Sequence, residues 1–296
     1  MAIDVGHGRH SMNLQDWIGR TENVTDVVTA TPVAALAATL DWPMPAGGYR
    51  PATGTPLPCL WHWLYFLPIH AQSDIGVDGH ATRGGFLPPV PLPRRMWAGS
   101  DFVFHEPLCI GDTLSRTSTI VGVTEKSGRS GDLVFVKVRH EIRRNGSDRV
   151  ALTEHHNIVY RAAPLPDDIA ATPQPAPQQS AWERRMLVDQ VLLFRYSALT
   201  FNGHRIHYDR RYVTGVEGYA GLVVHGPLIA TLLLDLLRQH VAGAAVRTFE
   251  FRALRPTTDC HPFSLHGAPE ADGRSVHLWG RDHGGWLTVD ATATLD

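Results

Sequence analysis

Two segments in the second half of the chain carry side chains that could act on a carbonyl compound. Residues 194–209 contain Asn202 and His207, and residues 221–228 place Gly226 where a long apolar helix should begin. Free amides at a helix start carry partial positive charge, so the Gly226 N–H could hold a carbonyl oxygen as it becomes an enolate. The His207 imidazole could move protons at the neighbouring carbons. A polar loop beside a capped core helix is the alternative that chemistry alone leaves open.

Metal and cofactor chemistry have weaker support. His204 and His207 form an H-x-x-H pair that could share a helical face and hold a metal. Only Asp209 lies near enough in sequence to complete a ligand set, and the intervening Arg205 opposes a cation. The sequence also lacks a phosphate-binding loop, the dinucleotide-binding glycine spacing and a G-x-S-x-G nucleophile motif. We therefore expect no metal and no cofactor.

A stretch rich in proline and glutamine divides the chain. Residues 163–180 have no apolar period and favour extended backbone, which is typical of a linker. This predicts an N-terminal domain over residues 12–162 and a C-terminal domain over residues 181–296.

The two parts repeat one plan, a helix followed by strands. In the first part we expect a helix over residues 31–40, an apolar segment over 60–69, and strands over 101–104, 112–123, 133–143 and 150–161. In the second part we expect a helix over residues 225–238 and strands over 245–254, 261–267, 275–282 and 285–295. Segregated helices and strands indicate an α+β fold. The second helix is apolar almost all round, which favours a sheet wrapped around a buried helix.

Composition excludes several classes of protein. The chain has 296 residues, a formal net charge of −2 and 43% hydrophobic residues, so a disordered chain and a basic nucleic-acid binder are not expected. Its three cysteines are too few and too scattered for a disulfide scaffold. No apolar run is long enough to span a membrane, and the first residues do not resemble a secretory signal. We expect a cytoplasmic protein whose translation starts at Met1 or Met12.

The two chemical segments resemble the hydratase motif of MaoC-like enzymes of the hotdog fold. In that family an F-x-A-L-[ST]-G-D-x-N-P-x-H-x-D stretch precedes a G-x-x-x-H-G helix start, and residues 197–209 and 221–226 match in order and approximate spacing. Residues 84–89 and 93–99 resemble the N-terminal half of one branch. That branch contains mesaconyl-CoA and itaconyl-CoA hydratases and mitochondrial-type 3-hydroxyacyl-thioester dehydratases. The resemblance covers nearly the whole chain.

The resemblance implies a double hotdog in which each half wraps an antiparallel sheet around a helix. It implies a single active site in the C-terminal half, with the N-terminal half shaping the acyl pocket. His207 matches the catalytic histidine, and Gly226 matches the glycine whose N–H binds the thioester carbonyl. Asn202 stands where many members have an aspartate. An amide cannot act as a carboxylate base, so we expect Asn202 to position the water and His207 to carry the protons.

The implied activity is reversible addition of water to an enoyl-CoA, giving a 3-hydroxyacyl-CoA. The resemblance favours a short branched dicarboxylic substrate such as mesaconyl-CoA or itaconyl-CoA, and a homo-oligomer such as a homodimer. Candidate substrate-binding or CoA-binding residues are Arg94, Arg95, Arg195, Tyr208 and His225. Each arginine could instead form a structural ion pair.

Two other functions stay open. One keeps the chemistry but changes the carrier, as a 3-hydroxyacyl dehydratase acting on acyl carrier protein. The other is a non-catalytic acyl-thioester binding protein or a thioesterase. Hotdog thioesterases usually place a carboxylate on the central helix. Asp235 is the only such residue in the helix expected here, well past its first turn.

Overall fold

Strands make up most of the regular secondary structure in the described residues. The computed structural model describes residues 13–43, 48–128, 131–162 and 172–296. Its strands are β1 (Thr21–Val27), β2 (Arg94–Phe104), β3 (Thr113–Gly128), β4 (Gly131–Arg144), β5 (Val150–Arg161), β6 (Trp182–Met186), β7 (Val246–Ala253), β8 (Phe263–Pro269), β9 (Ser275–Arg281) and β10 (Leu287–Leu295). Every predicted strand is confirmed. The first extends further than expected, because β2 begins at Arg94, and β1 and β6 were not predicted.

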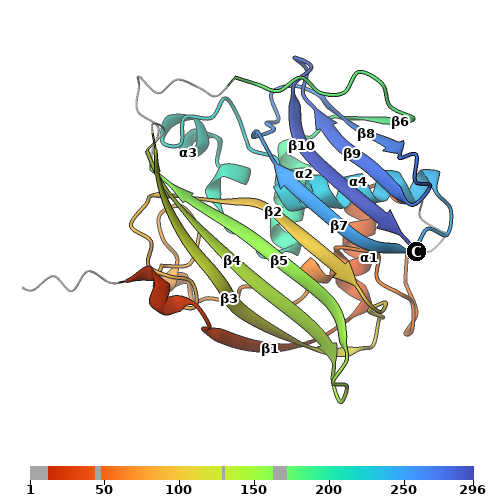
Figure 1. Ribbon diagram of the computed structural model, residues 1–296, viewed down its shortest axis with the longest axis horizontal. Coiled ribbons are helices and arrows are strands. Elements are labelled where there is room, and N and C mark those ends of the chain that lie inside the picture. The colour runs from red at the N-terminus through yellow and green to blue at the C-terminus, as the bar shows by residue number, and fades with distance from the viewer. Residues whose placement is uncertain (1–12, 44–47, 129–130, 163–171) are drawn as a thin grey trace, which may run out of the picture.

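All ten strands form one antiparallel sheet in the order β1-β3-β4-β5-β2-β7-β10-β9-β8-β6 (Figure 1). The first five strands come from the N-terminal part of the chain and the last five from the C-terminal part. The two sets join where β2 pairs with β7. Read from that junction outward, the two halves have the same order of strands. The internal repeat expected from the sequence is therefore present as a repeated sheet.

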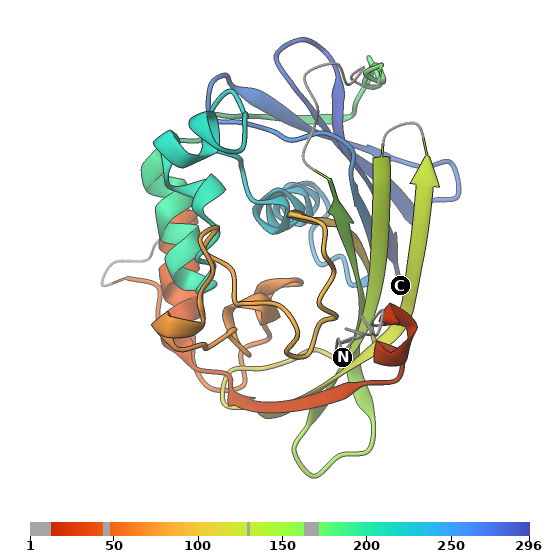
Figure 2. The same ribbon diagram turned by 90° about the vertical axis from the view of Figure 1, so that its left-hand side faces the viewer.

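The helices lie on one side of this sheet. They are α1 (Ala30–Thr39), α2 (Gln190–Leu199), α3 (Arg210–Gly215) and α4 (Gly226–His240), with 3-10 turns at Leu14–Trp17, Trp61–Leu64, Gln72–Asp74 and Arg205–His207. α4 is buried from Leu228 to Leu237 and packs against β6, β8 and β9. Figure 2 shows α4 between the sheet and the neighbouring pair α1 and α2. Both predicted helices are confirmed, and the buried helix is α4.

The two halves differ in what the sheet encloses. The C-terminal half encloses α4. In the corresponding stretch of the N-terminal half, the described residues form only two short 3-10 turns, Trp61–Leu64 and Gln72–Asp74, so they lack the enclosed helix that the resemblance implied for that half. The helix predicted over residues 31–40 forms as α1 but packs beside α2. Trp61, Tyr65 and Phe66 are almost fully buried, as expected of core residues. These bulky aromatic side chains fill space that a central helix would otherwise occupy.

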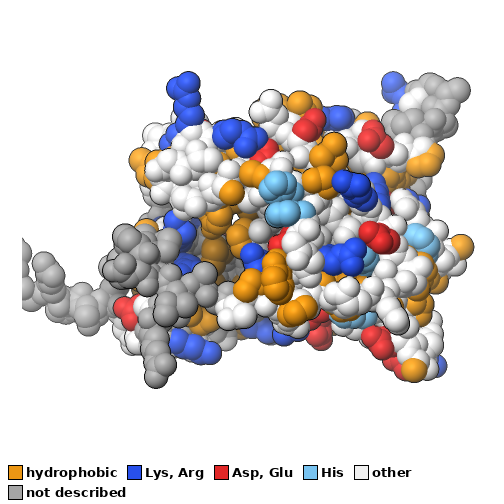
Figure 3. Space-filling model, turned by 90° about the horizontal axis from the view of Figure 1, so that it is seen from above, with side chains coloured by type: hydrophobic (Ala, Val, Ile, Leu, Met, Phe, Trp, Pro, Cys, Tyr) orange, Lys and Arg blue, Asp and Glu red, His pale blue; other side chains and the backbone are white. Residues whose placement is uncertain are grey.

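Helix length and surface charge are two remaining features of the fold. No helix in the described parts of the chain is long and apolar enough to cross a membrane. Figure 3 shows acidic and basic side chains interspersed on the face seen from above.

Of the predicted linker, residues 163–171 lie outside the described residues, as do residues 1–12, where the alternative start falls. The predicted domain limits of 12–162 and 181–296 stay predictions.

Candidate active site

The site is centred on His207, the last residue of the 3-10 turn Arg205–His207. Its Nδ1 lies 2.7 Å from the carbonyl oxygen of Val223, so Nδ1 carries the proton and donates it. Burial is the main effect on the pKa of His207. Together with the nearby His80 it lowers this pKa to about 4, although the Val223 hydrogen bond acts in the opposite direction. The ring is therefore neutral at pH 7. Its Nε2 has no hydrogen-bond partner among the described residues and offers a lone pair.

His225 supports the His207 ring. It is the N-cap of α4, and its ring stacks on that of His207 with centroids 3.7 Å apart. Its Nε2 lies 2.8 Å from the Ser197 hydroxyl on α2. Burial, followed by the charge of His207, holds the pKa of His225 well below its usual range. With 1% of its surface exposed, His225 is placed to fix the orientation of His207; its predicted contact with substrate stays a prediction.

Gly226 begins α4 directly after His225. No side chain caps this helix, and a first-turn N–H has no partner within its own helix. Gly226 also packs on Trp97 of β2: a Cβ added to it would lie 2.6 Å from Cε3 of the indole. Trp97 donates a hydrogen bond to Ser100 (3.0 Å) and stacks on Phe251 of β7. The helix start is thus held against the junction between the two half-sheets.

Asn202 caps its own loop. Its Oδ1 accepts a hydrogen bond from the backbone N–H of His204 at 3.0 Å, which leaves the side-chain NH₂ group to donate. Tyr208 is partly exposed, and its hydroxyl donates to the carbonyl of Gly203 at 2.9 Å. Asp209 is bound by Arg205 and caps α3. These contacts hold the loop that carries His207.

The three candidate arginines have different surroundings. Arg94 is paired with Glu217 at 3.4 Å and lies over the Tyr219 ring. Arg95 has no ion-pair partner among the described residues, and with Arg94 it lines a small cavity that also touches His204. Arg195 is exposed on α2, with no described contact that connects it to His207. The structure therefore brings Arg95 next to the candidate site.

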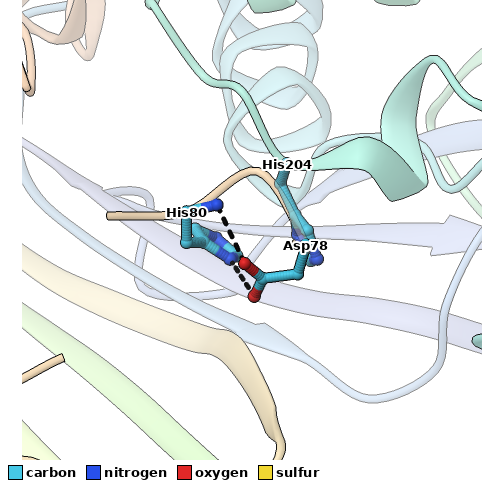
Figure 4. A group of neighbouring side chains, drawn as sticks. All are labelled: Asp78, His80 and His204. Atoms are coloured by element: carbon cyan, nitrogen blue, oxygen red, sulfur yellow. Dashed lines mark hydrogen bonds and ion pairs between the residues drawn. The ribbon is translucent and has the colours of Figure 1, made fainter. Parts of the chain in front are cut away.

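Two residues of the neighbourhood were not found from the sequence. Asp78 and His80 come from a loop of the N-terminal half and meet His204, as Figure 4 shows. A polar atom from each of the three side chains lies within 4.8 Å of the other two. The rings of His204 and His207 meet edge-on with centroids 5.5 Å apart, and Nδ1 of His207 is bonded to Val223; whether the pair binds a metal stays a prediction. No local pattern around Asp78 marks this contact.

Comparison with known proteins assigns the chain to a family. Residues 60–259 match the family model of hydroxyacyl-thioester dehydratase type 2. The chain belongs to that family. The protein is accordingly a hydro-lyase of the hydratase and dehydratase type, as the MaoC-like resemblance predicted.

Individual relatives agree with this assignment. The chain is 47% identical to the mesaconyl-C4-CoA hydratase of Chloroflexus aurantiacus, over 94% of this chain and 96% of that protein. It is 26% identical to the mitochondrial hydroxyacyl-thioester dehydratase type 2 of Schizosaccharomyces pombe, over 81% of this chain and 87% of that protein. A double hotdog protein from Mycobacterium tuberculosis superposes with a TM-score of 0.55 at 15% identity, covering 94% of this chain and 96% of that one. The predicted α+β double hotdog fold is confirmed.

Proposed function

We propose that this protein adds water reversibly to a short dicarboxylic enoyl-CoA, with mesaconyl-C4-CoA as the first candidate. The observation that carries the proposal is the state of His207: buried, neutral, fixed by Val223 and His225, and offering Nε2 beside the start of α4. A relative with 47% identity that is named as a mesaconyl-C4-CoA hydratase supports the choice of substrate.

The chemistry proceeds through charge on the thioester oxygen. The oxygen of water bonds to the β carbon and loses a proton, while the π electrons shift toward the thioester carbonyl. The Gly226 N–H at the start of α4 donates to that oxygen and stabilises its negative charge. His207 carries the proton to the α carbon, which completes the addition, and the same steps run backward in dehydration. The NH₂ group of Asn202 is available to donate a hydrogen bond to the water.

Arg95 is our candidate for binding the second carboxylate of the substrate. Its guanidinium lines the cavity next to His204 and has no carboxylate partner in the described residues. Arg94, in contrast, is already paired with Glu217. A guanidinium binds a carboxylate through two parallel hydrogen bonds, so a free one beside the site favours a dicarboxylic acyl group. CoA contacts of Arg195 and Tyr208, the homodimer and the cytoplasmic location remain predictions.

A dehydratase acting on acyl carrier protein is the second candidate, and the relative from Schizosaccharomyces pombe favours it. The aromatic side chains that fill the N-terminal half leave less room for a long acyl chain, which argues for the shorter substrate. A thioesterase is disfavoured, because the carboxylate of Asp235 is bound by Arg184 (2.9 Å) and Arg238 (2.8 Å). These ion pairs occupy the carboxylate and tie α4 to β6 through Arg184.

The test is the loss of enoyl-thioester absorbance with mesaconyl-C4-CoA, itaconyl-CoA and crotonyl-CoA. We expect the dicarboxylic substrates to be turned over with higher kcat/KM than crotonyl-CoA. Arg95→Met should raise KM for the dicarboxylic substrates and leave that for crotonyl-CoA unchanged, while the exposed Arg211→Met serves as control. Preference for crotonyl or longer chains would move the assignment to fatty acid dehydration. Binding of every thioester without turnover would refute the hydratase proposal.

A further inference from the structure

The C-terminal motif lacks a free carboxylate. Asn202 is an amide whose Oδ1 is occupied by the His204 backbone N–H. Asp209 accepts two hydrogen bonds from Arg205 and a third from the backbone of Tyr212. An amide NH₂ can donate to a water molecule but cannot take its proton. The C-terminal motif therefore offers no carboxylate that could orient the water while His207 takes its proton.

A loop of the N-terminal half is fastened to the His207 loop. The backbone N–H of Arg205 donates to the carbonyl of Asp78 at 2.9 Å, and its side chain donates to the carbonyl of Val77 at 2.9 Å. Gly79 has a φ of +89°, and a Cβ at this position would collide with the carbonyl oxygen of Gly203. Only a glycine allows the two loops to approach so closely. The contact therefore places Asp78 beside the active loop by backbone geometry.

The carboxylate of Asp78 has a fixed orientation. Oδ1 accepts from the backbone N–H of His80 at 3.0 Å, and Oδ2 lies 2.9 Å from Nδ1 of the same residue (Figure 4). Burial would raise the pKa of Asp78, but these hydrogen bonds and the charge of His80 outweigh it and hold the pKa below its usual range. The His80 ring lies against His204, with centroids 4.0 Å apart. His204 in turn meets His207 edge-on.

A cavity lies beside this carboxylate and reaches the active loop at His204 and Ile206. Asp78, Arg95 and His204 line a hollow of about 20 Å³, which is enough for a single water molecule. The groups facing it combine a carboxylate, a guanidinium and an imidazole, so a water there has both donors and acceptors. Burial lowers the pKa of His80 and His204, and the positive charge of Arg95 adds to this effect. That charge disfavours a metal cation in the cluster.

We propose that Asp78 is the carboxylate that orients the substrate water, so that the active site is completed by the N-terminal half. The inference rests on the hydratase function proposed above. Asp78 accepts a hydrogen bond from the water as the water oxygen bonds to the β carbon, and the neutral His207 takes the proton from that water and delivers it to the α carbon. His80 is a positioning residue, since it acts by orienting the Asp78 carboxylate. The N-terminal half thereby places the water, and the C-terminal half carries the proton transfer.

This division can be tested with two reactions measured on the same variants. The first is hydration of mesaconyl-C4-CoA. The second is exchange of the α protons of a saturated analogue, methylsuccinyl-CoA, in deuterium oxide, which needs no water addition. Asp78→Asn keeps the acceptor for the His80 backbone but removes the charge. We expect it to lower kcat for hydration on the order of 10²-fold with little change in KM, and to leave α-proton exchange within about threefold.

Controls separate this role from a structural one. His207→Gln should abolish both reactions, and Asp74→Asn, an exposed position in the same loop, should alter neither. If Asp78→Asn hydrates at the wild-type rate, or loses hydration and exchange equally, the proposal is overturned. Activity lost on dialysis against a chelator and restored by a divalent cation would also overturn it, because the cluster would then bind metal. If the wild-type protein exchanges α protons but hydrates no substrate, the proposed function itself fails.

Discussion

Replacing Gly226 by alanine tests how closely α4 and β2 are packed at the site. The added Cβ would lie 2.6 Å from Cε3 and 2.8 Å from Cζ3 of Trp97. Carbon atoms in normal contact are about 3.5–4.0 Å apart, so roughly 1 Å of movement is required. Trp97 has little freedom to move, because its Nε1 is bonded to Ser100, which in turn donates to Glu154 at 3.0 Å. The start of α4 is therefore the part that must shift.

The size of the effect follows from this geometry. Overpacking of a tight core costs about 1–3 kcal/mol, and we expect a loss of unfolding free energy in that range for Gly226→Ala. The alanine keeps the backbone N–H but displaces it from the thioester oxygen. A displacement of about 1 Å at a catalytic group can cost on the order of 10²-fold in rate, and we expect kcat to fall by that order.

Urea unfolding and hydration kinetics measure the two effects. Gly215→Ala is the matched control, since nothing lies within 4 Å of a Cβ there, and it should leave both stability and kcat near wild type. Trp97→Leu removes the indole edge, so Gly226→Ala should cost less in that background, as a double-mutant cycle would measure. The reasoning is refuted if Gly226→Ala is as stable and active as the wild type, or if the two substitutions are strictly additive.

Three further predictions concern the neighbouring residues. Because burial lowers the pKa of His207 to about 4, the acid limb of kcat/KM should lie near pH 4; a limb near pH 6.5 would contradict the neutral-base assignment. The same lowered pKa means that stability contributed by neutral His207 is complete above pH 6.5 and lost as the pH falls toward 4. The free energy of unfolding measured in urea should therefore fall more for the wild type than for His207→Gln as the pH is lowered over this interval. Asn202→Ala should reduce kcat more than it raises KM, because it removes a contact to the reacting water; a change in KM alone would count against this role.

Much of the fold could be predicted because its signals are local. The apolar run after Gly226 and the alternating runs from Thr113 onward mark α4 and the long strands directly. β6 escaped prediction because it has only five residues, three of them charged, and its pairing with β8 is what makes it a strand. Buried aromatic residues and short 3-10 turns stand in the first half where the second half has α4, and the sequence pattern did not reveal this difference.

Only those site residues that lie within a continuous sequence motif could be predicted. His207, Asn202 and Gly226 lie in motifs whose spacing can be recognised in the sequence. Asp78 could not be found in this way, because its loop meets the active loop across more than a hundred residues of chain, through the backbone of Gly203 and Arg205. Contacts between backbone atoms place few demands on which side chains are present, so the sequence shows them only where close packing requires a glycine. The role of His225 as support for His207 likewise emerges only from the stacked rings.

The most direct test of the whole account is the rate of mesaconyl-C4-CoA hydration by His207→Gln, beside the wild type and the exposed-histidine control His70→Gln. The account predicts that His207→Gln, folded as judged by circular dichroism, loses kcat by about 10²–10⁴-fold, while His70→Gln retains wild-type activity. A folded His207→Gln that hydrates the substrate at the wild-type rate would contradict the central claim that this neutral, buried imidazole carries the proton transfer.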